Sequence, residues 1–239
     1  MKRNFYFILV LLFSVILASE VMAKEKPRLG VLRFSNNTSA GWWSGTAGRD
    51  LQDMLIAELA SMKSFNVLER KEIDAVISEQ NLGQSGRVSK ATRSKIGNIT
   101  GAKYLVAGTV SSFEKGTSGQ GGGISFKGFS IGGKKAKAYI AVDLKVIDVE
   151  TGSIADARTV EANSGSGGLS LGLHKWGFGG SLANEKKTPT GKAIRACIME
   201  IADYLECSMV KGKDDPCMKD YDAKESRRRE KTKGSINLE

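Results

Sequence analysis

The segment AKAYIAVDLKVIDVETG, residues 136–152, decides the fold class of this chain. Apolar and polar residues alternate along it, which is typical of a half-buried β-strand. The residues expected to face the core are Ala138, Ile140, Val142 and Leu144. The triplet Glu150-Thr151-Gly152 predicts a tight turn, and residues 153–162 predict a strand that runs back. The middle of the chain is therefore expected to form strands at the centre of a sheet.

Apolar periodicity on either side predicts the remaining elements. Strands are expected at residues 28–34, 65–68 and 104–110, and helices at 46–62, 69–80 and 88–98. The dipeptide Thr188-Pro189 predicts an N-cap and first turn for a last helix that ends near Val210. The predicted inward residues of the helices are Leu51, Leu55, Leu59, Ile73, Val76, Ile77, Ile194, Ile198, Ile201 and Leu205. The fold class is mixed α/β.

Glycine is dense at residues 116–133 and again at 164–168. Gly132-Gly133 has the form of a two-residue hairpin turn, which would place Phe126 opposite Tyr139. Alternation resumes after the second glycine stretch and ends in two aromatic residues. The residues concerned are Leu169, Leu171, Leu173, Trp176 and Phe178. We therefore expect two long β-hairpins, at about 113–145 and 153–185.

Residues 1–23 have the parts of a secretory signal peptide in the right order. Lys2 and Arg3 are followed by an apolar run over 5–18 and by small or modest residues at 21–23. The alternative is an uncleaved anchor, but the run is shorter than the about 20 residues that span a bilayer. Export to a bacterial-type envelope is expected. The residue directly after the cleavage point is not a cysteine, so we expect no lipid anchor of the lipoprotein kind.

The formal net charge of +10 raises the question of a nucleic-acid partner. The charged C-terminal tail, residues 211–239, mixes basic with acidic residues, which is typical of a solvated segment. Together with export, this composition makes nucleic acid an unexpected partner. An anionic lipid surface suits a basic exported protein better.

Three cysteines lie near the C-terminus. In an oxidising compartment one disulfide is expected, and Cys207–Cys217 is the favoured pair because Cys197 lies on the apolar stripe of the last helix. The spacing lacks CxxC doublets, and His174 is the only histidine, so we expect no metal site. We therefore expect these cysteines to form a disulfide and not to bind a metal ion.

No constellation in the sequence points to an enzyme. A single histidine leaves little room for nucleophile and base chemistry. Residues 128–134 match the start of a phosphate-binding loop, but Lys135 stands where magnesium needs a hydroxyl group, and no helix follows. We expect neither catalysis nor a cofactor.

Four stretches carry a resemblance to a known family. They are DMLIAEL at 53–59, FNVLERKEIDAVI at 65–77, AKYLVAGTV at 102–110 and IAVDLKVIDVETG at 140–152. With their spacing, these stretches resemble the CsgG family, the curli production assembly and transport component, an outer-membrane secretion channel. The resemblance covers about residues 28–210, within a domain that we delimit at 24–210.

The resemblance implies a periplasmic α/β domain with two extended β-hairpins that contribute to an oligomeric transmembrane β-barrel. The ring would be homo-oligomeric and nonamer-like, and curli-like or other unfolded polypeptides would pass through it without ATP. Loop 35–46 would form the pore constriction, with Trp43 at the family's aromatic position beside Trp42 and Ser44. The alternative for either tryptophan is that it fastens the loop onto the helix that begins near Thr46.

The same resemblance places the hairpin residues Phe126, Tyr139, Leu169, Leu171, Leu173, Trp176 and Phe178 in membrane strands. Lys127 and Lys137 would have to face the lumen or the headgroups, because a lysine facing lipid at mid-bilayer costs roughly 2–4 kcal/mol. Family channels are usually lipoproteins, so the missing lipidation cysteine is a departure. A soluble periplasmic adaptor, which binds a partner in the envelope, is the alternative function. Accessory envelope proteins are further possible partners of the channel.

Overall fold

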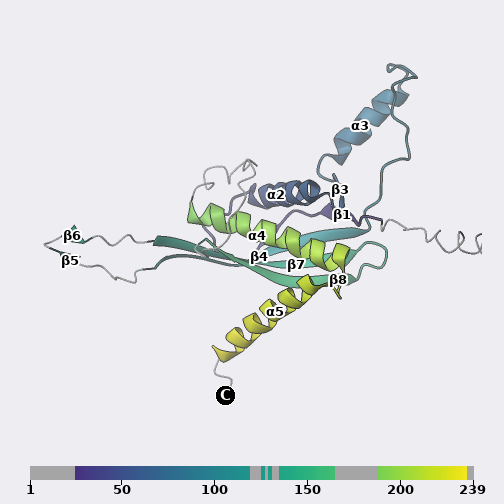
Figure 1. The fold of residues 1–239 in the computed structure, drawn as a ribbon. Coiled ribbons are helices and arrows are strands. Elements are labelled where there is room, and N and C mark those ends of the chain that lie inside the picture. Colours follow the sequence, from purple (N-terminus) through teal and green to yellow (C-terminus); the bar gives the residue numbers. More distant parts are fainter. Residues whose placement is uncertain (1–24, 119–124, 127–128, 131–134, 165–187, 236–239) are drawn as a thin grey trace, which may run out of the picture.

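The computed structural model describes residues 25–118, 125–126, 129–130, 135–164 and 188–235. A mixed sheet forms the centre of the molecule, with the strand order β3-β1-β4-β7-β8 and with β2 paired to β4 (Figure 1). The strands of this sheet are β1 (Arg28–Val31), β2 (Ser35–Asn36), β3 (Asn66–Leu68), β4 (Tyr104–Ser118), β7 (Lys135–Asp148) and β8 (Ile154–Asn163). The pairs β1–β3, β1–β4 and β2–β4 are parallel, whereas β4–β7 and β7–β8 are antiparallel. The predicted α/β class is confirmed.

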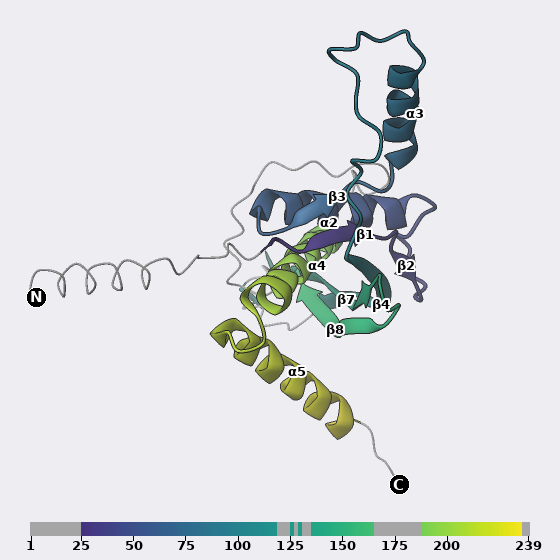
Figure 2. The ribbon, with the colours of Figure 1, turned by 90° about the vertical axis from the view of Figure 1, so that its right-hand side faces the viewer.

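Helices α2 (Ala47–Met62) and α4 (Pro189–Leu205) pack against each other and against the sheet (Figures 1 and 2). The predicted inward leucines of α2 are at most 1% exposed, and Ile194, Ile198, Ile201 and Leu205 of α4 are at most 3% exposed. The alternating residues of β7 that were expected to face the core are buried as well. Each fully buried side chain of this size contributes about 1.5–3 kcal/mol to folding, so this layer holds the domain together.

Helix α4 begins where the sequence predicts. Thr188 is the N-cap, and its hydroxyl oxygen accepts a hydrogen bond from the backbone N–H of Gly191 at 3.1 Å. Pro189 occupies the first turn, where its missing N–H costs nothing. The helix continues into a π-helical turn, η2 (Glu206–Lys211).

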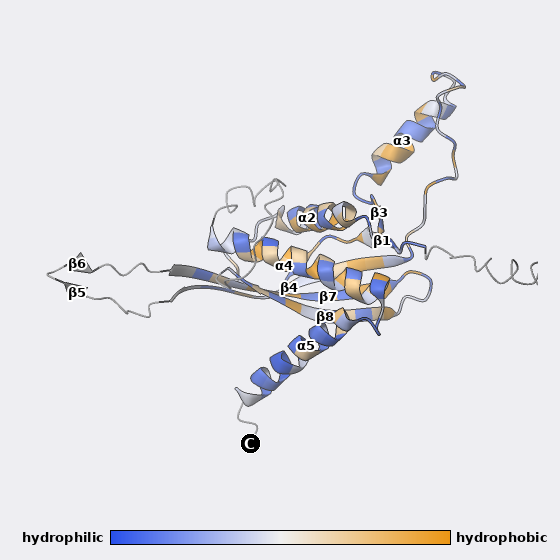
Figure 3. Cartoon of the chain, viewed as in Figure 1, coloured by the Kyte–Doolittle hydropathy of each residue, from blue (hydrophilic) through white to orange (hydrophobic). Residues whose placement is uncertain are grey.

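The remaining helices depart from the body. Helix α3 (Ile73–Gln84) projects from one end of the molecule, and α5 (Pro216–Gly234) extends diagonally from the end of η2 (Figure 2). Figure 3 shows that α5 is hydrophilic over almost its whole length, while α3 carries apolar residues among polar ones. Within the described ranges, no helix combines the length and the apolarity needed to cross a bilayer.

Two expectations for the segment after β3 are wrong. Val76 and Ile77 do not face the core but are 42% and 41% exposed, because no other helix or strand in the described ranges packs on this face of α3. Residues 88–98 form turns and extended chain in place of a helix, with Gly97 at a positive φ of 88°. Apolar periodicity identified α3 correctly, but it cannot say whether the chain itself supplies a surface to bury the apolar face.

The register of β4 with β7 differs from the predicted one. Tyr139 pairs with Glu114, and Phe126 of β5 (Ser125–Phe126) pairs with Phe129 of β6 (Phe129–Ser130). The predicted pairing of Phe126 with Tyr139 is therefore wrong, and Gly132-Gly133 lies outside the described residues. A glycine-dense segment offers several turn positions, and the buried alternation of the long strands sets the register instead.

Most of the charged tail forms helix α5, which the sequence analysis did not predict, and most residues of this helix are exposed. Asp215 caps α5 by accepting a hydrogen bond from the N–H of Cys217 at 2.9 Å, and Pro216 occupies the first turn. The dipeptide Asp215-Pro216 is the same start signal as Thr188-Pro189. It could have predicted this helix.

Candidate functional site

Loop 35–46, the predicted constriction loop, begins with strand β2, which pairs with β4. Ser35 and Asn36 pair with Thr109 and Val110, and the hydroxyl oxygens of Ser35 and Thr109 lie 2.7 Å apart. The next backbone N–H, that of Asn37, donates to the carbonyl of Val110 at 2.9 Å. The first residues of the loop therefore have a fixed position relative to the sheet.

A local network shapes the next turn of the loop. The Asn36 side-chain carbonyl accepts hydrogen bonds from the N–H and the hydroxyl of Thr38, at 3.0 and 2.7 Å. The Asn36 amide donates to the Thr38 carbonyl at 2.9 Å, and the Thr38 hydroxyl oxygen accepts from the N–H of Ala40 at 3.2 Å. Asparagine and threonine side chains commonly close such turns. The backbone before the tryptophans is thus held by its own side chains.

The end of the loop is attached to the segment that follows β1. The guanidinium of Arg33 donates to the Gly45 carbonyl at 2.7 Å, and the N–H of Phe34 donates to the Gly48 carbonyl at 3.1 Å. Phe34 is buried, and its ring lies so close to Gly108 of β4 that a Cβ there would be 2.3 Å from the ring atom Cε1. Position 108 requires glycine for this reason, and the backbone of Phe34 holds the first turn of α2 through Gly48.

The two tryptophans form an aromatic cluster with a residue of the sheet. Trp42 meets Phe113 of β4 edge to face, with ring centroids 5.6 Å apart, and meets Trp43 in the same manner at 5.5 Å. Both tryptophans are half-buried and pack against the core, while Ser44 is exposed. Such edge-to-face pairs add about 0.5–1.5 kcal/mol beyond area burial. The cluster of Trp42, Trp43 and Phe113 fastens the loop to β4.

The position of the aromatic cluster coincides with an irregularity in β4. Val110 pairs with Val142 and Ser112 pairs with Ala141, so Ser111 is an extra residue. A bulge of this kind bends the strand and increases its twist. Beyond it, β4 and β7 stay paired over residues 112–118 and 135–141, which we call the β4–β7 ribbon (Figure 1). Strand β8 pairs with β7 as far as Tyr139, so only the outer part of the ribbon, residues 115–118 with 135–138, has two strands. Phe113 lies at the inner end of the ribbon, where the sheet still has three strands.

The other predicted site residues are only partly within the described ranges. Tyr139 lies in β7, half-buried, and shares a face of the ribbon with Glu114. The backbone of Phe126 lies in β5. The residues Leu169, Leu171, Leu173, Trp176 and Phe178 lie outside the described residues. Phe113 also belongs to the site, although the sequence analysis did not single it out. It could have been noticed as an aromatic residue three positions after the predicted strand 104–110.

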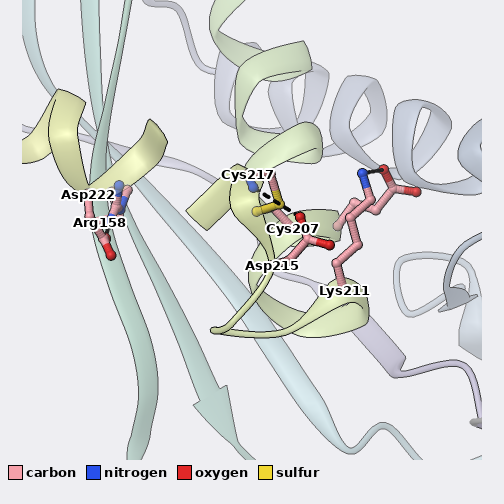
Figure 4. Close-up of a disulfide and its surroundings, with 7 residues drawn as sticks. Arg158, Cys207, Lys211, Asp215, Cys217 and Asp222 are labelled. Carbon is pink, nitrogen blue, oxygen red and sulfur yellow. Dashed lines mark hydrogen bonds and ion pairs between the residues drawn. A yellow bond between two sulfur atoms is a disulfide. The ribbon is translucent and has the colours of Figure 1, made fainter. Parts of the chain in front are cut away.

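The C-terminal helix is joined to the body by a disulfide and an arginine (Figure 4). Cys207 of η2 and Cys217 of α5 are bonded, with Cα atoms 6.1 Å apart; this is the pair that the sequence favours. Arg158 of β8 forms an ion pair with Asp222 at 2.7 Å, and its guanidinium lies 4.7 Å from the ring centroid of Tyr204 and 5.7 Å from that of Tyr221. Burial, followed by the hydrogen bond to Asp156, raises the pKa of Tyr204. No pattern in the sequence singles out Arg158 as a functional or structural residue.

The chemistry of these groups is limited. Cys197 is 1% exposed, and burial raises the pKa of its thiol, which keeps it protonated and unreactive. Cys207, Asp215 and Cys217 lie close enough together to hold a metal ion, but both sulfur atoms are committed to the disulfide. Aromatic contact and backbone positioning are therefore what the candidate site can provide.

The protein has an α/β body, and aromatic side chains fasten loop 35–46 to the inner end of the β4–β7 ribbon. The profile of the CsgG family, described as curli production assembly/transport component CsgG, matches residues 11–236. The chain belongs to the CsgG family, and it is a CsgG-like protein of the cell envelope. No curated protein sequence matches it.

Solved structures with a similar chain trace have low sequence identity. The hypothetical protein CT253 from Chlamydia trachomatis is 15% identical, over 76% of this chain and 96% of that chain, with a TM-score of 0.44. The PelC dodecamer from Paraburkholderia phytofirmans is 13% identical, over 74% of this chain and 87% of that chain, with a TM-score of 0.38. The lipoprotein GNA1162 from Neisseria meningitidis is 15% identical, over 62% of this chain and 89% of that chain, with a TM-score of 0.34.

Proposed function

We propose that this chain is the protomer of an outer-membrane channel that exports curli-like or other unfolded polypeptides without ATP. It would be exported by its signal peptide and act as a homo-oligomeric, nonamer-like ring between periplasm and outer membrane, without catalysis. Membership of the CsgG family supports this proposal. The observation that carries it is the aromatic cluster, which fastens loop 35–46 to the inner end of the β4–β7 ribbon.

The two tryptophans have different roles in this proposal. Trp42 is held between Phe113 and Trp43, so it positions the loop. Trp43 contacts the ring of Trp42 but, within the described residues, not that of Phe113, and it is next to the exposed Ser44, so we assign the contact with the passing chain to Trp43. A ring of such aromatics, one from each protomer, offers rigid apolar surface that can grip an unfolded chain weakly.

The ribbon would provide strands of the barrel, with hairpins at about 113–145 and 153–185. Glu114 and Tyr139 are paired and therefore share a face, and Lys137 lies on the same face because it is two residues from Tyr139. We assign this polar face to the lumen, because a lysine that faced lipid would be costly. Side chains on the opposite face, including Phe113, would then lie toward the body or the lipid.

The proposed constriction is tested by single-channel conductance in planar bilayers. Trp43→Ala is expected to raise the conductance and to reduce block by an added unfolded curli-like polypeptide, because it removes the ring of aromatic surface. Trp43→Phe, which keeps an aromatic ring, is the matched control and should retain most of the block. If Trp43→Ala conducts and blocks as the unaltered protein does, the constriction is not at this residue.

A second function, that of a soluble periplasmic adaptor, is favoured by helix α3, whose apolar residues are open to a partner. Cell fractionation separates the two functions. A channel is recovered with the outer membrane and needs detergent for release, whereas an adaptor is recovered as a monomer in the soluble periplasm.

A further inference from the structure

Residues 73–101, which we call the α3 arm, project from the body of the molecule (Figures 1 and 2). Gly83 is the only buried residue of helix α3. The large apolar side chains that the arm exposes are Val76, Ile77, Leu82, Ile96 and Ile99, each at 40% or more. Exposed apolar side chains gathered on one element mark a surface that binds something.

The α3 arm is a built structure and not a loose loop. At its base, the guanidinium of Arg70 donates to the Thr100 carbonyl at 2.7 Å, which joins the two limbs. Near its tip, the Gln84 amide donates to the Ser94 carbonyl at 3.3 Å. Lys71 forms an ion pair with Asp53 of α2 at 2.8 Å, which fixes the arm to the body. The chain therefore holds the exposed apolar residues at a defined place.

The return limb of the arm is basic. Residues 85–101 contain no acidic side chain. Their basic residues are Arg87, Lys90, Arg93 and Lys95, all exposed. Within the described part of the chain, none of the four takes part in an ion pair. The partner of the arm should thus be acidic and should also have apolar surface.

Such a surface exists on the same chain, at the junction of α2 with α4. The residues of this acidic seam are Glu58 of α2, Glu200 and Asp203 of α4, and Glu206 of η2. Helix α2 packs against α4, and Glu200, Asp203 and Glu206 are spaced three residues apart, so they lie along one side of the helix. Lys224 and Lys211 pair with Glu200 and Glu206, but no ion pair involves Glu58 or Asp203 in the described residues.

The seam also has apolar material suited to a partner. Met62 lies one turn from Glu58 on α2, and Met199 lies one turn from Asp203 on α4, and both are partly exposed. Methionine side chains adapt easily to a surface that packs against them. The seam therefore matches the α3 arm in charge and in apolar character.

We propose that the α3 arm of one copy of this chain docks on the acidic seam of a second copy. The arm and the seam are different surfaces of the protomer, so the contact is head to tail, the kind that generates a ring when its rotation closes. This inference rests on the homo-oligomer of the proposed function and names the surfaces that build it.

A membrane fits the arm less well than a second copy does. The α3 arm and the β4–β7 ribbon extend from opposite ends of the molecule (Figure 1). A bilayer that received the ribbon would lie away from the arm. The seam, in contrast, is part of every neighbouring protomer.

Charge reversal in the full chain tests the contact. The arm variant is Lys90→Glu with Lys95→Glu, and the seam variant is Glu58→Lys with Asp203→Lys. Each alone is expected to weaken assembly about tenfold or more in sedimentation velocity, because like charges then face each other. A chain that carries both pairs of reversals should assemble again, since each reversed arm then meets a reversed seam of opposite sign. Lys231→Glu with Lys233→Glu, on α5, is the matched control and should assemble normally.

A cysteine pair tests the same contact by position. Ile96→Cys and Asp203→Cys in one chain should give disulfide-linked ladders of copies, and each single variant should give none. The docking proposal is overturned if the arm and seam variants assemble normally, or if combining the reversals in one chain restores nothing. It is also overturned if the arm variant loses binding to vesicles of anionic phospholipid but assembles as before, which would make the arm a membrane contact.

The outcomes for the ring and for the channel are distinguishable. Assembly through arm and seam without conductance would contradict the channel and support the docking. Conductance with assembly unchanged by charge reversal would contradict the docking alone. A protein that is a monomer at every concentration would contradict both.

Discussion

Trp42 and Trp43 are neighbours in the sequence but have different contacts. Trp42 packs on Phe113 and on Trp43, whereas no other ring contacts Trp43 within the described residues. We expect Trp42→Ala to lower the free energy of unfolding by roughly 2–3 kcal/mol, somewhat less than a fully buried tryptophan would cost. Trp43→Ala should cost less. Urea denaturation of both variants measures this order, and a reversed order would mean that Trp43 is the fastening residue.

Gly108 is the other position where a single residue decides local structure. A Cβ at this position would meet the Phe34 ring at 2.3–2.8 Å. Gly108→Ala should therefore lower the free energy of unfolding by about 1–3 kcal/mol, as overpacking does. Gly116→Ala, in the same strand but with nothing within 4 Å of the added atom, is the control and should have little effect. Equal losses in thermal or urea melts would show that backbone freedom, and not the ring, explains the glycine.

At the level of elements, the Cys207–Cys217 disulfide connects η2 to the start of α5. Farther along α5, the ion pairs Arg158–Asp222 and Lys224–Glu200 and the contact of Tyr221 with Tyr204 attach the helix to the body. We expect reduction to release the start of α5 and to make it sensitive to proteases, with a loss of about 2–3 kcal/mol for a loop of this length. Limited proteolysis with and without reductant measures the effect. The same reductant applied to Cys207→Ser with Cys217→Ser should change nothing, and an unreduced chain that is equally sensitive would contradict the role of the bond.

The elements differ in how far the sequence predicted them. Helices α2 and α4 were predicted with their inward residues, because each apolar stripe is buried by the sheet and by the other helix. The same periodicity in α3 led to a wrong orientation for Val76 and Ile77, since burial depends on a surface that the described part of the chain does not provide. The predicted pairing of Phe126 with Tyr139 was wrong because the pairing of the long strands overrides a local turn preference. The pair Asp215-Pro216 is a start signal for α5. The helix was nevertheless not predicted, because its residues are almost all polar and form no apolar stripe.

At the scale of the whole molecule, the sequence resemblance gave the family, which the family profile confirms. It also led to loop 35–46 as the candidate site. The contact of Trp42 with Phe113 could not be predicted, because it depends on the bulge at Ser111 that sets which face of β4 carries the phenylalanine. The proposed channel combines these levels: a fixed loop, a ribbon that leaves the body, and an arm that reaches a neighbour.

The proposed function requires that these protomers assemble into a pore. Purified full-length protein, extracted from the outer-membrane fraction in mild detergent, should therefore be added to a planar lipid bilayer and its ion current recorded. A pore gives stepwise, uniform conductance increments that disappear when the oligomer is dissociated by heat before addition. A protein that purifies as a water-soluble monomer and gives no current is not a channel.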